Sequence, residues 1–414
     1  MEDKKRPLLV PQYMRKFKCI GSECEDSCCI GWKVDVDRET YMKYRKIRDE
    51  ELTSLCDQYV KRNRSNSNGE SNYAKIKLLD DMKCPFLNED MLCKMQIKRG
   101  EEYLSDVCAI YPRITYIVNG VLERSATLSC PEAARLALLN EQGIEFDETV
   151  ESTEIKNLVK VNINTHDLKY NNKPQKYLWQ IRVFTISLLQ NRNYPLHERI
   201  IILGMFFQKL QEYISDERVN DVEDLIASYT NIIDEDSLGE SLSSIPVQYN
   251  FQMQLLKEIA DKRFFMGINN KRYLECFSSF LGGIQYTEDA KVEEIGERYH
   301  NAYNDYYRPF MDKHEYILEN YLVNYVFKNL FPFTGEKSLF DSYMMMVLHY
   351  SLIKMNLIGM AVFHKGLTVD LVIKLIQSFA KTVEHTQKYL DTIAELMRQN
   401  GFNTMAYMAI LIKN

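Results

Sequence analysis

The sequence predicts a mainly α-helical protein, with a small cysteine-rich module on the N-terminal side and an all-helical domain after it. Nine of the ten cysteines lie before residue 131, and beyond residue 150 several segments repeat apolar residues at helical spacing. Because 414 residues are too many for one compact core, we predict a cysteine-rich domain over residues 1–150 and a helical domain over residues 151–414.

A small β-hairpin is predicted inside the first domain, in the stretch "YPRITYIVNGVLERSATLSC". Ile114, Tyr116 and Val118 alternate with other residues, as in a half-buried strand. The dipeptide Asn119-Gly120 follows them, and two-residue hairpin turns favour this pair.

Helices are predicted in three segments of the second domain. Residues 176–214 have the pattern of a helical hairpin, with Pro195 placed to start its second helix. In residues 315–331 apolar side chains recur at steps of four, which gives an apolar helix face. Over residues 368–401 apolar residues recur every seven positions, so we predict one long helix that packs along another helix.

The composition, with 45% hydrophobic and 27% charged residues, is typical of a soluble globular protein. A net charge of −6 argues against nucleic acid as a partner, because phosphates favour a basic surface. The most apolar long run, Tyr343–Phe363, carries His349 and Lys354 near its middle, so we predict a buried helix and no membrane span. The first residues lack the apolar core of a secretory signal, and we expect a cytoplasmic protein.

The stretch "KCIGSECEDSCCIGW" places four cysteines within eleven positions, and four more in short motifs, besides the isolated Cys56, follow along the first domain. A reducing compartment disfavours disulfides, so clustered cysteines there are more often metal ligands. The first domain is therefore predicted to be a metal-binding module. Its candidate ligands are Cys19, Cys24, Cys28, Cys29, Cys84, Cys93, Cys108 and Cys130.

The spacing of these cysteines predicts a metal site without deciding which metal it holds. Thiolate binds both zinc and iron–sulfur clusters, and the spacing matches neither class cleanly. Cys28 and Cys29 are adjacent, so their side chains tend to diverge. Either one of the two is a ligand while the other packs, or the two serve two different sites.

The cysteine motifs also resemble a known family. The pattern C-x4-C-x3-C-C-x-G-W from Cys19 to Trp32, followed by "CPFL", "YPR" and "SCPEAARL", is similar to that of the flagellin lysine-N-methylase (FliB) family, within the wider CxxCxxCC group. Further similarity lies in "HEYILENYLVNYVFKNLFPF", "LIKMNLIGMA" and "SFAKTVEHTQKYL", so the resemblance covers essentially the whole chain.

This resemblance implies methyl transfer from S-adenosylmethionine to the ε-amine of lysines on flagellin. It also implies a 4Fe–4S cluster on the cysteines, with zinc as the alternative. The residues themselves locate no pocket for S-adenosylmethionine. The best glycine pair, in "FLGGIQY", follows no predicted strand, so we interpret it as a loop and not as a nucleotide-binding turn.

Lysine methylation needs a neutral amine, and the unperturbed lysine pKa near 10.4 calls for a general base or a desolvating pocket. The catalytic candidates are Glu384 and His385 in "KTVEHTQK", which match a family motif, and Glu319 in "LENYLVNY". For Glu384 and His385 we favour a salt-bridged helix face over catalysis. Lys381 and Lys388, one helical turn away, would be the partners on that face.

Arg113 in "YPRITY" and Glu132 in "CPEAARL" adjoin candidate metal ligands and are the candidate cofactor-binding residues, as partners of the ligands. A function of a different class is also open. The chain would then be an iron–sulfur or zinc-binding module for electron transfer or protein interaction, without methyl transfer.

Overall fold

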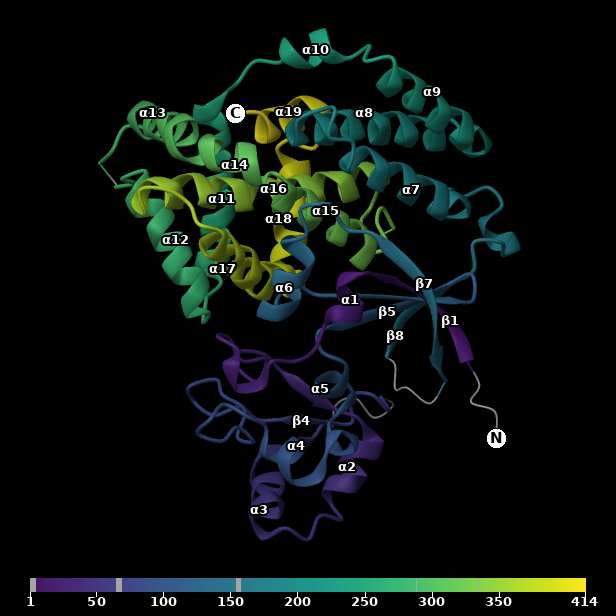
Figure 1. Ribbon diagram of the computed structural model, residues 1–414, viewed down its shortest axis with the longest axis vertical. Coiled ribbons are helices and arrows are strands. Elements are labelled where there is room, and N and C mark those ends of the chain that lie inside the picture. Colours follow the sequence, from purple (N-terminus) through teal and green to yellow (C-terminus); the bar gives the residue numbers. More distant parts are fainter. Residues whose placement is uncertain (1–4, 65–68, 154–157, 288, 334) are drawn as a thin grey trace. The chain divides into compact units, whose positions relative to one another are not determined.

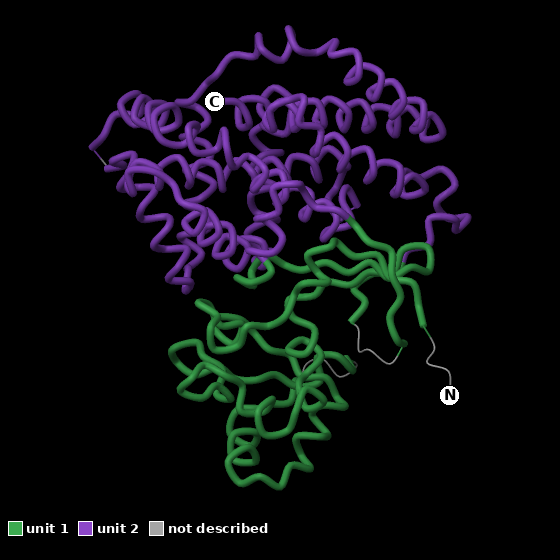
Figure 2. Tube along the Cα trace, in the orientation of Figure 1, with its two compact units in different colours: residues 1–133, 146–162 green, residues 134–145, 163–414 purple. Residues whose placement is uncertain are grey.

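The computed structural model describes residues 5–64, 69–153, 158–287, 289–333 and 335–414. The chain divides into two compact units (Figure 2). Unit 1 comprises residues 1–133 and 146–162, and unit 2 comprises residues 134–145 and 163–414. Helix α6 (Pro131–Leu138) crosses this division, because its first turn belongs to unit 1 and the rest to unit 2.

Unit 1 contains a five-stranded sheet in the order β7-β1-β6-β5-β8 (Figure 1). Its strands are β1 (Lys5–Pro11), β5 (Arg113–Val118), β6 (Val121–Ala126), β7 (Phe146–Ser152) and β8 (Val159–Ile163). The predicted hairpin is confirmed: β5 and β6 pair antiparallel, and Asn119 and Gly120 have φ of 51° and 83°, as a type I′ turn requires. The prediction missed β1, β7 and β8, which extend this hairpin into a sheet.

A second sheet of unit 1, in the order β2-β4-β3, carries short helices around it. These elements are β2 (Val34–Val36), β3 (Val60–Arg62), β4 (Ala74–Ile76), α2 (Arg38–Tyr44), α3 (Glu50–Tyr59), α4 (Lys94–Arg99) and α5 (Asp106–Ile110), whereas α1 (Tyr13–Lys16) packs on the five-stranded sheet. The carboxylate of Asp37 accepts from the Thr40 N–H at 2.8 Å, and that of Asp49 accepts from the Leu52 N–H at 3.0 Å. These N-caps start α2 and α3.

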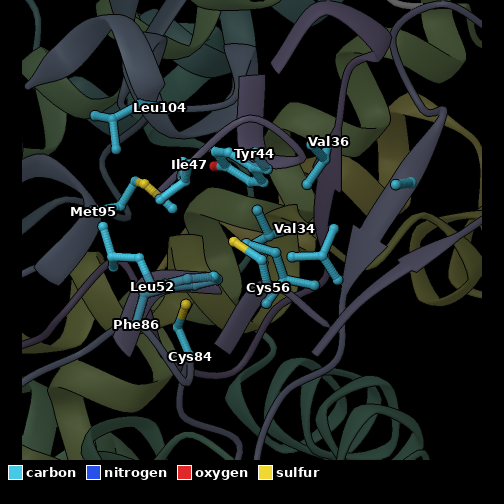
Figure 3. Close-up of a cluster of buried hydrophobic side chains, with 13 residues drawn as sticks. Val34, Val36, Tyr44, Ile47, Leu52, Cys56, Cys84, Phe86, Met95 and Leu104 are labelled. Carbon is cyan, nitrogen blue, oxygen red and sulfur yellow. The ribbon is translucent and has the colours of Figure 1, made fainter. Parts of the chain in front are cut away.

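A hydrophobic core lies among these elements (Figure 3). Its buried members are Val34, Val36, Tyr44, Ile47, Leu52, Cys56, Val60, Ala74, Ile76, Cys84, Phe86, Met95 and Leu104. Cys29, Cys93 and Cys108 pack against this core while remaining partly exposed. The core of unit 1 thus brings together cysteines that are up to 79 positions apart in the chain.

Within the described residues, unit 2 is built of helices from residue 168 onward, as predicted for the second domain (Figure 1). They are α7 (Leu178–Leu189), α8 (Leu196–Ser215), α9 (Val222–Asp234), α10 (Gly239–Ser243), α11 (Tyr249–Phe265), α12 (Lys271–Gly283), α13 (Val292–Ala302), α14 (Arg308–His314), α15 (Tyr316–Lys328), α16 (Leu339–Phe363), α17 (Val369–Phe379), α18 (Gln387–Gln399) and α19 (Met405–Ile412). The helical hairpin around Pro195 and the helix predicted in residues 315–331 are both confirmed, as α7–α8 and α15.

Helix α16 is the central helix of unit 2 and contacts α8, α11, α12, α13, α15, α17 and α19. Of the helices in the described residues, it alone is long and apolar enough to cross a membrane, and 89% of its most apolar window is buried inside the protein. The predicted buried helix is confirmed. Two of its buried polar residues bond within the protein: Lys354 Nζ donates to the Ile412 carbonyl at 2.8 Å, and His349 Nδ1 donates to the Met345 carbonyl at 2.6 Å.

The glycine pair of "FLGGIQY" lies in the last turn of α12, so the predicted loop is wrong. A Cβ added to Gly283 would lie 1.9 Å from the carbonyl oxygen of Gly359 on α16. Two helix backbones can approach this closely only where neither residue has a side chain. The pair therefore serves helix packing, a tertiary requirement that the local sequence does not reveal.

The single long helix predicted over residues 368–401 is also wrong in one respect. Helix α17 passes into a π-helical turn, Ala380–Glu384, and α18 begins after a break at His385 and Thr386. A π turn inserts an extra residue and rotates all that follows, so the heptad pattern cannot hold one phase across it. On both sides of the turn the apolar residues still face inward, since Ile376 and Ile393 are fully buried.

Candidate functional site

Four cysteines of unit 1 gather at the core of Figure 3. The Cys84 N–H donates to the Cys29 carbonyl at 2.9 Å, so these two residues lie on neighbouring extended segments. Cys93 is brought to the same place by its bridge to Leu87, and Cys108 by helix α5. We call this set the inner quartet: Cys29, Cys84, Cys93 and Cys108.

The thiols of the inner quartet lie close enough to influence one another. Burial, with smaller contributions from nearby thiolates, raises the pKa of Cys84 to about 11 and that of Cys108 to about 12. The hydrogen bond with Cys28, and then burial, raise the pKa of Cys29 strongly. Burial is thus the main reason why the thiols of Cys84, Cys93 and Cys108 resist ionisation, and the charges of neighbouring cysteines add to it.

Four further cysteines of unit 1 form a second set, of which Cys28 and Cys130 lie near a pair of aromatic rings tilted by 47° to each other. The rings of Trp32 and Tyr111 lie 5.4 Å apart; the Trp32 indole donates to the Cys28 carbonyl, and the Tyr111 hydroxyl is 3.1 Å from that of Ser129. Ser129 directly precedes Cys130. Burial raises the pKa of Cys130 to about 12, and the charges of Cys24 and Cys28 contribute to this rise. We call this set the outer quartet: Cys19, Cys24, Cys28 and Cys130.

The two predicted cofactor-binding residues adjoin the outer quartet. The Arg113 guanidinium lies 5.4 Å from the ring of Phe17, and burial lowers its pKa while the charges of Cys19 and Cys130 oppose that shift. Glu132 is in the first turn of α6, and its backbone N–H interacts with the Cys130 sulfur. Their predicted role as partners of metal ligands stays a prediction.

In the part of the chain that the structure describes, no three Cys, His, Asp or Glu side chains converge tightly enough to hold a metal ion. The quartets are therefore groups of neighbouring thiols and not preformed metal sites. None of the ten cysteines forms a disulfide. Cys56 lies in the same core as the inner quartet. Burial and the charge of Asp57 raise its pKa, and Arg45 opposes this rise. Cys276 is buried in α12 of unit 2.

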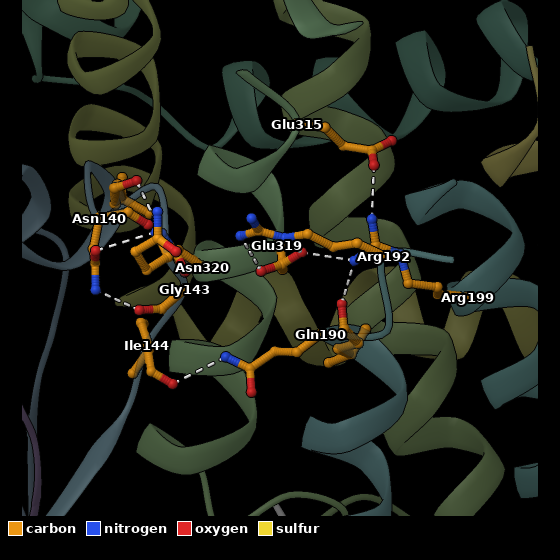
Figure 4. Close-up of polar contacts among 12 residues, drawn as sticks. Asn140, Gly143, Ile144, Gln190, Arg192, Arg199, Glu315, Glu319 and Asn320 are labelled. Carbon is orange, nitrogen blue, oxygen red and sulfur yellow. Dashed lines mark hydrogen bonds and ion pairs between the residues drawn. The ribbon is translucent and has the colours of Figure 1, made fainter. Parts of the chain in front are cut away.

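Glu319, a catalytic candidate, lies at the centre of a buried ion-pair network in unit 2 (Figure 4). Its side chain is 1% exposed, and its two oxygens accept from Arg192 at 2.9 and 3.0 Å and from Arg199 at 2.7 Å. Arg199, itself 2% exposed, also pairs with Glu315 at 2.7 Å. The next residue on α15, Asn320, donates to the carbonyls of Leu138 and Asn140 at 3.1 and 2.8 Å.

Glu384, a second catalytic candidate, is buried as well, which corrects the predicted salt-bridged helix face. Its carboxylate pairs with Lys328 of α15 and accepts from the Tyr321 hydroxyl at 2.9 Å. These partners lie on α15, and the π turn that ends at Glu384 directs this residue into the helix packing. Burial opposes ionisation of Glu384, but the charges of Lys328 and His349 outweigh it and lower the pKa to about 2.

His385, the third catalytic candidate, is exposed in the break between α17 and α18. A hollow of about 670 Å³ runs along α18 and begins two residues later, lined in part by Gln387, Lys388 and Asp391. The sequence analysis missed Arg199 and Lys328, which complete the buried networks. A signal for Arg199 existed, since it is a cation inside the otherwise apolar run "RIIILGMFF".

The buried pair at Glu384 predicts a pH-dependent stability. Since the folded-state pKa is about 2 against an ordinary value of 4.5, the pair contributes about 3 kcal/mol above pH 5, and this contribution is lost as the pH falls towards 2. E384Q should therefore lower the free energy of unfolding by about 3 kcal/mol at pH 7, with a smaller difference at pH 3. Urea unfolding of both proteins at the two pH values measures this.

The matched control is E275Q, which removes the exposed pair of Glu275 with Lys374. Exposed pairs contribute about 1 kcal/mol or less, so E275Q should change stability little at either pH. An E384Q effect as small as that of E275Q, or one that does not shrink on acidification, would contradict the account of this pair.

Comparison with known proteins identifies the family of this chain. Residues 182–411 match the profile of the FliB lysine N-methylase C-terminal domain. The lysine-N-methylases of Salmonella typhimurium (strain LT2) and Salmonella choleraesuis are each 23% identical over 387 residues, 91% of this chain and 92% of theirs. The flagellar biosynthetic protein FliU of Salmonella muenchen is 31% identical over 139 residues, 33% of this chain and 80% of FliU.

No solved structure matches the chain. The family profile covers more than half of the sequence, including α8, α15, α16 and the networks of Glu319 and Glu384. The chain therefore belongs to the FliB lysine N-methylase family.

Proposed function

We propose that the protein is a cytoplasmic protein-lysine N-methyltransferase that uses S-adenosylmethionine to methylate lysines of flagellin. The observation that carries this proposal is the match to two proteins named lysine-N-methylase along nine-tenths of the chain. The name of the third relative, a flagellar biosynthetic protein, supports flagellin as the acceptor. The burial of α16 supports a soluble protein.

We further propose that cysteines of unit 1 hold an iron–sulfur cluster. The support for this proposal is the type of donor, because eight cysteines of unit 1 offer sulfur, the ligand atom of such clusters. When bound, a cluster with an open iron supplies a Lewis acid that can hold the amino and carboxylate groups of S-adenosylmethionine. Arg113, close to the outer quartet, would add a positive charge for that carboxylate.

The protein's own residues must then leave the acceptor lysine neutral, because an ammonium has no lone pair. Glu384 is poorly suited to take this proton: transfer from an amine of pKa near 10.4 to a carboxylate of pKa about 2 costs about 11 kcal/mol. Glu319 has both oxygens engaged by two arginines. We therefore favour His385, since imidazole suits proton transfer near neutral pH and the residue is exposed beside the hollow along α18.

The test is methyl transfer in a defined mixture. Protein purified without oxygen is incubated with S-adenosylmethionine and purified flagellin, and the flagellin peptides are analysed by mass spectrometry. We expect lysines to gain about 14 Da, and H385A to lower the rate most strongly near pH 8, where an imidazole is neutral and can accept the lysine proton, without changing thermal stability. The surface control K374A, which removes the exposed pair of Lys374 with Glu275, should retain the rate.

Absence of methyl-lysine with metal-loaded protein would contradict the proposal. It would favour the other class of function, an electron-transfer or protein-interaction module, if the metal centre also cycled reversibly between two oxidation states. An unchanged rate in H385A would contradict the role of His385 alone.

A further inference from the structure

Three consecutive apolar side chains are exposed at the C-terminal end of α11. Phe264 is 47% exposed, Phe265 is 83% exposed and Met266 is 40% exposed. Of the large apolar side chains in the described residues, Phe265 is the most exposed. Single exposed apolar residues are normal, but a run of three is unusual on a soluble surface and marks an interaction site. We call this set the apolar triplet: Phe264, Phe265 and Met266.

The apolar triplet is held in place by the fold around it. The Gly267 N–H donates to the Phe264 carbonyl at 2.9 Å, and Gly267 has the positive φ of 85° that ends a helix. The ring of Phe264 stacks on that of Phe277 of α12, with 6.2 Å between their centres. Phe265 is therefore presented from an ordered turn, so a partner that covers it orders little additional chain.

One buried cation connects the apolar triplet to the turn before His385. Arg263 is 9% exposed; its Nε donates to the Thr382 carbonyl at 2.9 Å, and its Nη1 donates to the Gly267 carbonyl at 2.8 Å. Thr382 belongs to the π turn Ala380–Glu384, which directly precedes His385. The same guanidinium therefore fixes both the chain after the triplet and the backbone that leads to the proposed base.

The apolar triplet also adjoins the hollow along α18. Lys262 of α11 lines this hollow, which has a volume of about 670 Å³ and begins two residues beyond His385. Residues three and four positions further along a helix lie on the same face, so Phe265 and Met266 follow Lys262 on this side of α11. A hollow for one side chain beside an apolar surface for the segment around it suits an enzyme that acts on a protein.

The charges around the triplet argue against a lipid surface as its partner. On α11, Lys262 pairs with Glu258 at 3.6 Å and Lys257 pairs with Asp261 at 2.6 Å. The Arg263 guanidinium bonds to carbonyls, and the whole chain has a net charge of −6. A membrane-binding segment offers free cations to anionic lipids, whereas these cations are already engaged.

The size of the triplet argues against a stable dimer of this chain. A stable dimer buries about 800 Å² on each partner, across 20 to 30 residues. Three side chains provide far less surface and suit a transient contact. The kind of partner that remains is a protein that binds briefly at this surface and reaches the hollow with one of its side chains.

We propose that the apolar triplet is the docking surface for the acceptor protein, which places an apolar side chain against Phe265 while its target lysine enters the hollow along α18. This deepens the proposed function and rests on it, including the position of the reaction beside His385. Phe265 is the anchor of this contact, because aromatic side chains carry much of the binding energy at interfaces. It does not touch the reacting amine, so it should affect KM and not kcat.

The experiment measures methylation over a series of flagellin concentrations by the wild type, F265S and L168S. Leu168 is the matched control, because its side chain is 81% exposed and lies in a different surface element, Leu168–Tyr170. We expect F265S to raise the KM for flagellin about tenfold, a loss typical of an interface anchor, with kcat unchanged. L168S should keep both values. Both variants should keep the wild-type Tm, because each removes an exposed side chain.

The outcomes separate this inference from the proposed function. An unchanged KM in F265S, or an equal rise in L168S, overturns the docking surface, while methylation by the wild type still supports the methyltransferase. Vesicles of anionic phospholipid that bind the wild type but not F265S, with KM unchanged, overturn it in favour of a membrane. If the wild type forms no methyl-lysine, direct binding of flagellin is compared: weaker binding by F265S supports docking and contradicts methyl transfer alone, whereas equal binding overturns both.

A second measurement needs no variant. Hydrogen exchange of the full wild-type chain is followed by mass spectrometry with and without purified flagellin. We expect slower exchange in peptides that cover residues 262–270, and unchanged exchange in peptides that cover residues 166–172 around Leu168. Unchanged exchange over residues 262–270 at a flagellin concentration that saturates methylation would overturn the proposal.

Discussion

Replacement of Glu319 by glutamine is expected to lower the free energy of unfolding by about 3–5 kcal/mol, the usual cost of removing one partner of a buried ion pair. Most of this cost should come from Arg199, which is 2% exposed and would keep its charge inside the protein. Arg192 is 46% exposed and can be solvated, so its lost pair should cost less. Urea unfolding at pH 7 measures the difference.

Glu315 provides the matched control, because it pairs with the same Arg199 but its side chain is 38% exposed. E315Q should cost about 1 kcal/mol or less, since glutamine can still accept from the Leu196 N–H that Glu315 now binds at 3.0 Å. Equal losses in the two variants would mean that burial does not decide the energetics of this network. The same two variants also test whether Glu319 takes part in methylation. We expect E319Q protein that folds to methylate at the wild-type rate.

Alanine at Gly283 is expected to be the most damaging small substitution in unit 2. Its Cβ would lie 1.9 Å from the Gly359 carbonyl oxygen, a backbone atom that can move only if α12 and α16 separate. Overpacking of this kind costs about 3 kcal/mol or more, well above the 1 kcal/mol that alanine gains over glycine in a helix. Thermal unfolding should show a clear drop in Tm.

The neighbouring Gly282 is the control, in the same turn of α12. A Cβ there would meet the Phe363 ring at 3.0 Å, and this ring is 54% exposed and can rotate away. G282A should therefore be neutral or slightly stabilising. If G283A were as stable as G282A, the close crossing of α12 and α16 would not be the reason for glycine at position 283.

The parts of the fold that the sequence predicted correctly depend on local signals. The Asn119-Gly120 pair carries the positive φ values of its own turn, and the apolar run of α16 is buried because nearly every residue in it is apolar. β1 gave no such signal, because Pro7 and Pro11 within it are unfavourable in strands, and it exists through pairing with distant β6 and β7. The π turn before His385 likewise follows from tertiary packing and not from the heptad pattern.

The candidate site likewise has features that the sequence predicted and features that depend on contacts between distant segments. The sequence identified eight cysteines as one group, but their separation into two quartets depends on contacts between segments such as Cys29 with Cys84. Glu384 looked like a surface residue because Lys381 lies near it in sequence, whereas its true partner, Lys328, lies 56 positions away. Pairing across such distances is invisible to spacing rules.

The measurement that most directly tests the central claim is flagellin methylation as a function of metal content. One preparation of the protein is assayed as purified, after removal of its iron, and after reconstitution with iron and sulfide, with S-adenosylmethionine present throughout. We predict that methyl-lysine formation falls to background without iron and returns in proportion to the iron restored. Equal rates in all three samples would contradict a cluster-dependent methyltransferase, and no methyl-lysine in the fully loaded sample would contradict methyl transfer itself.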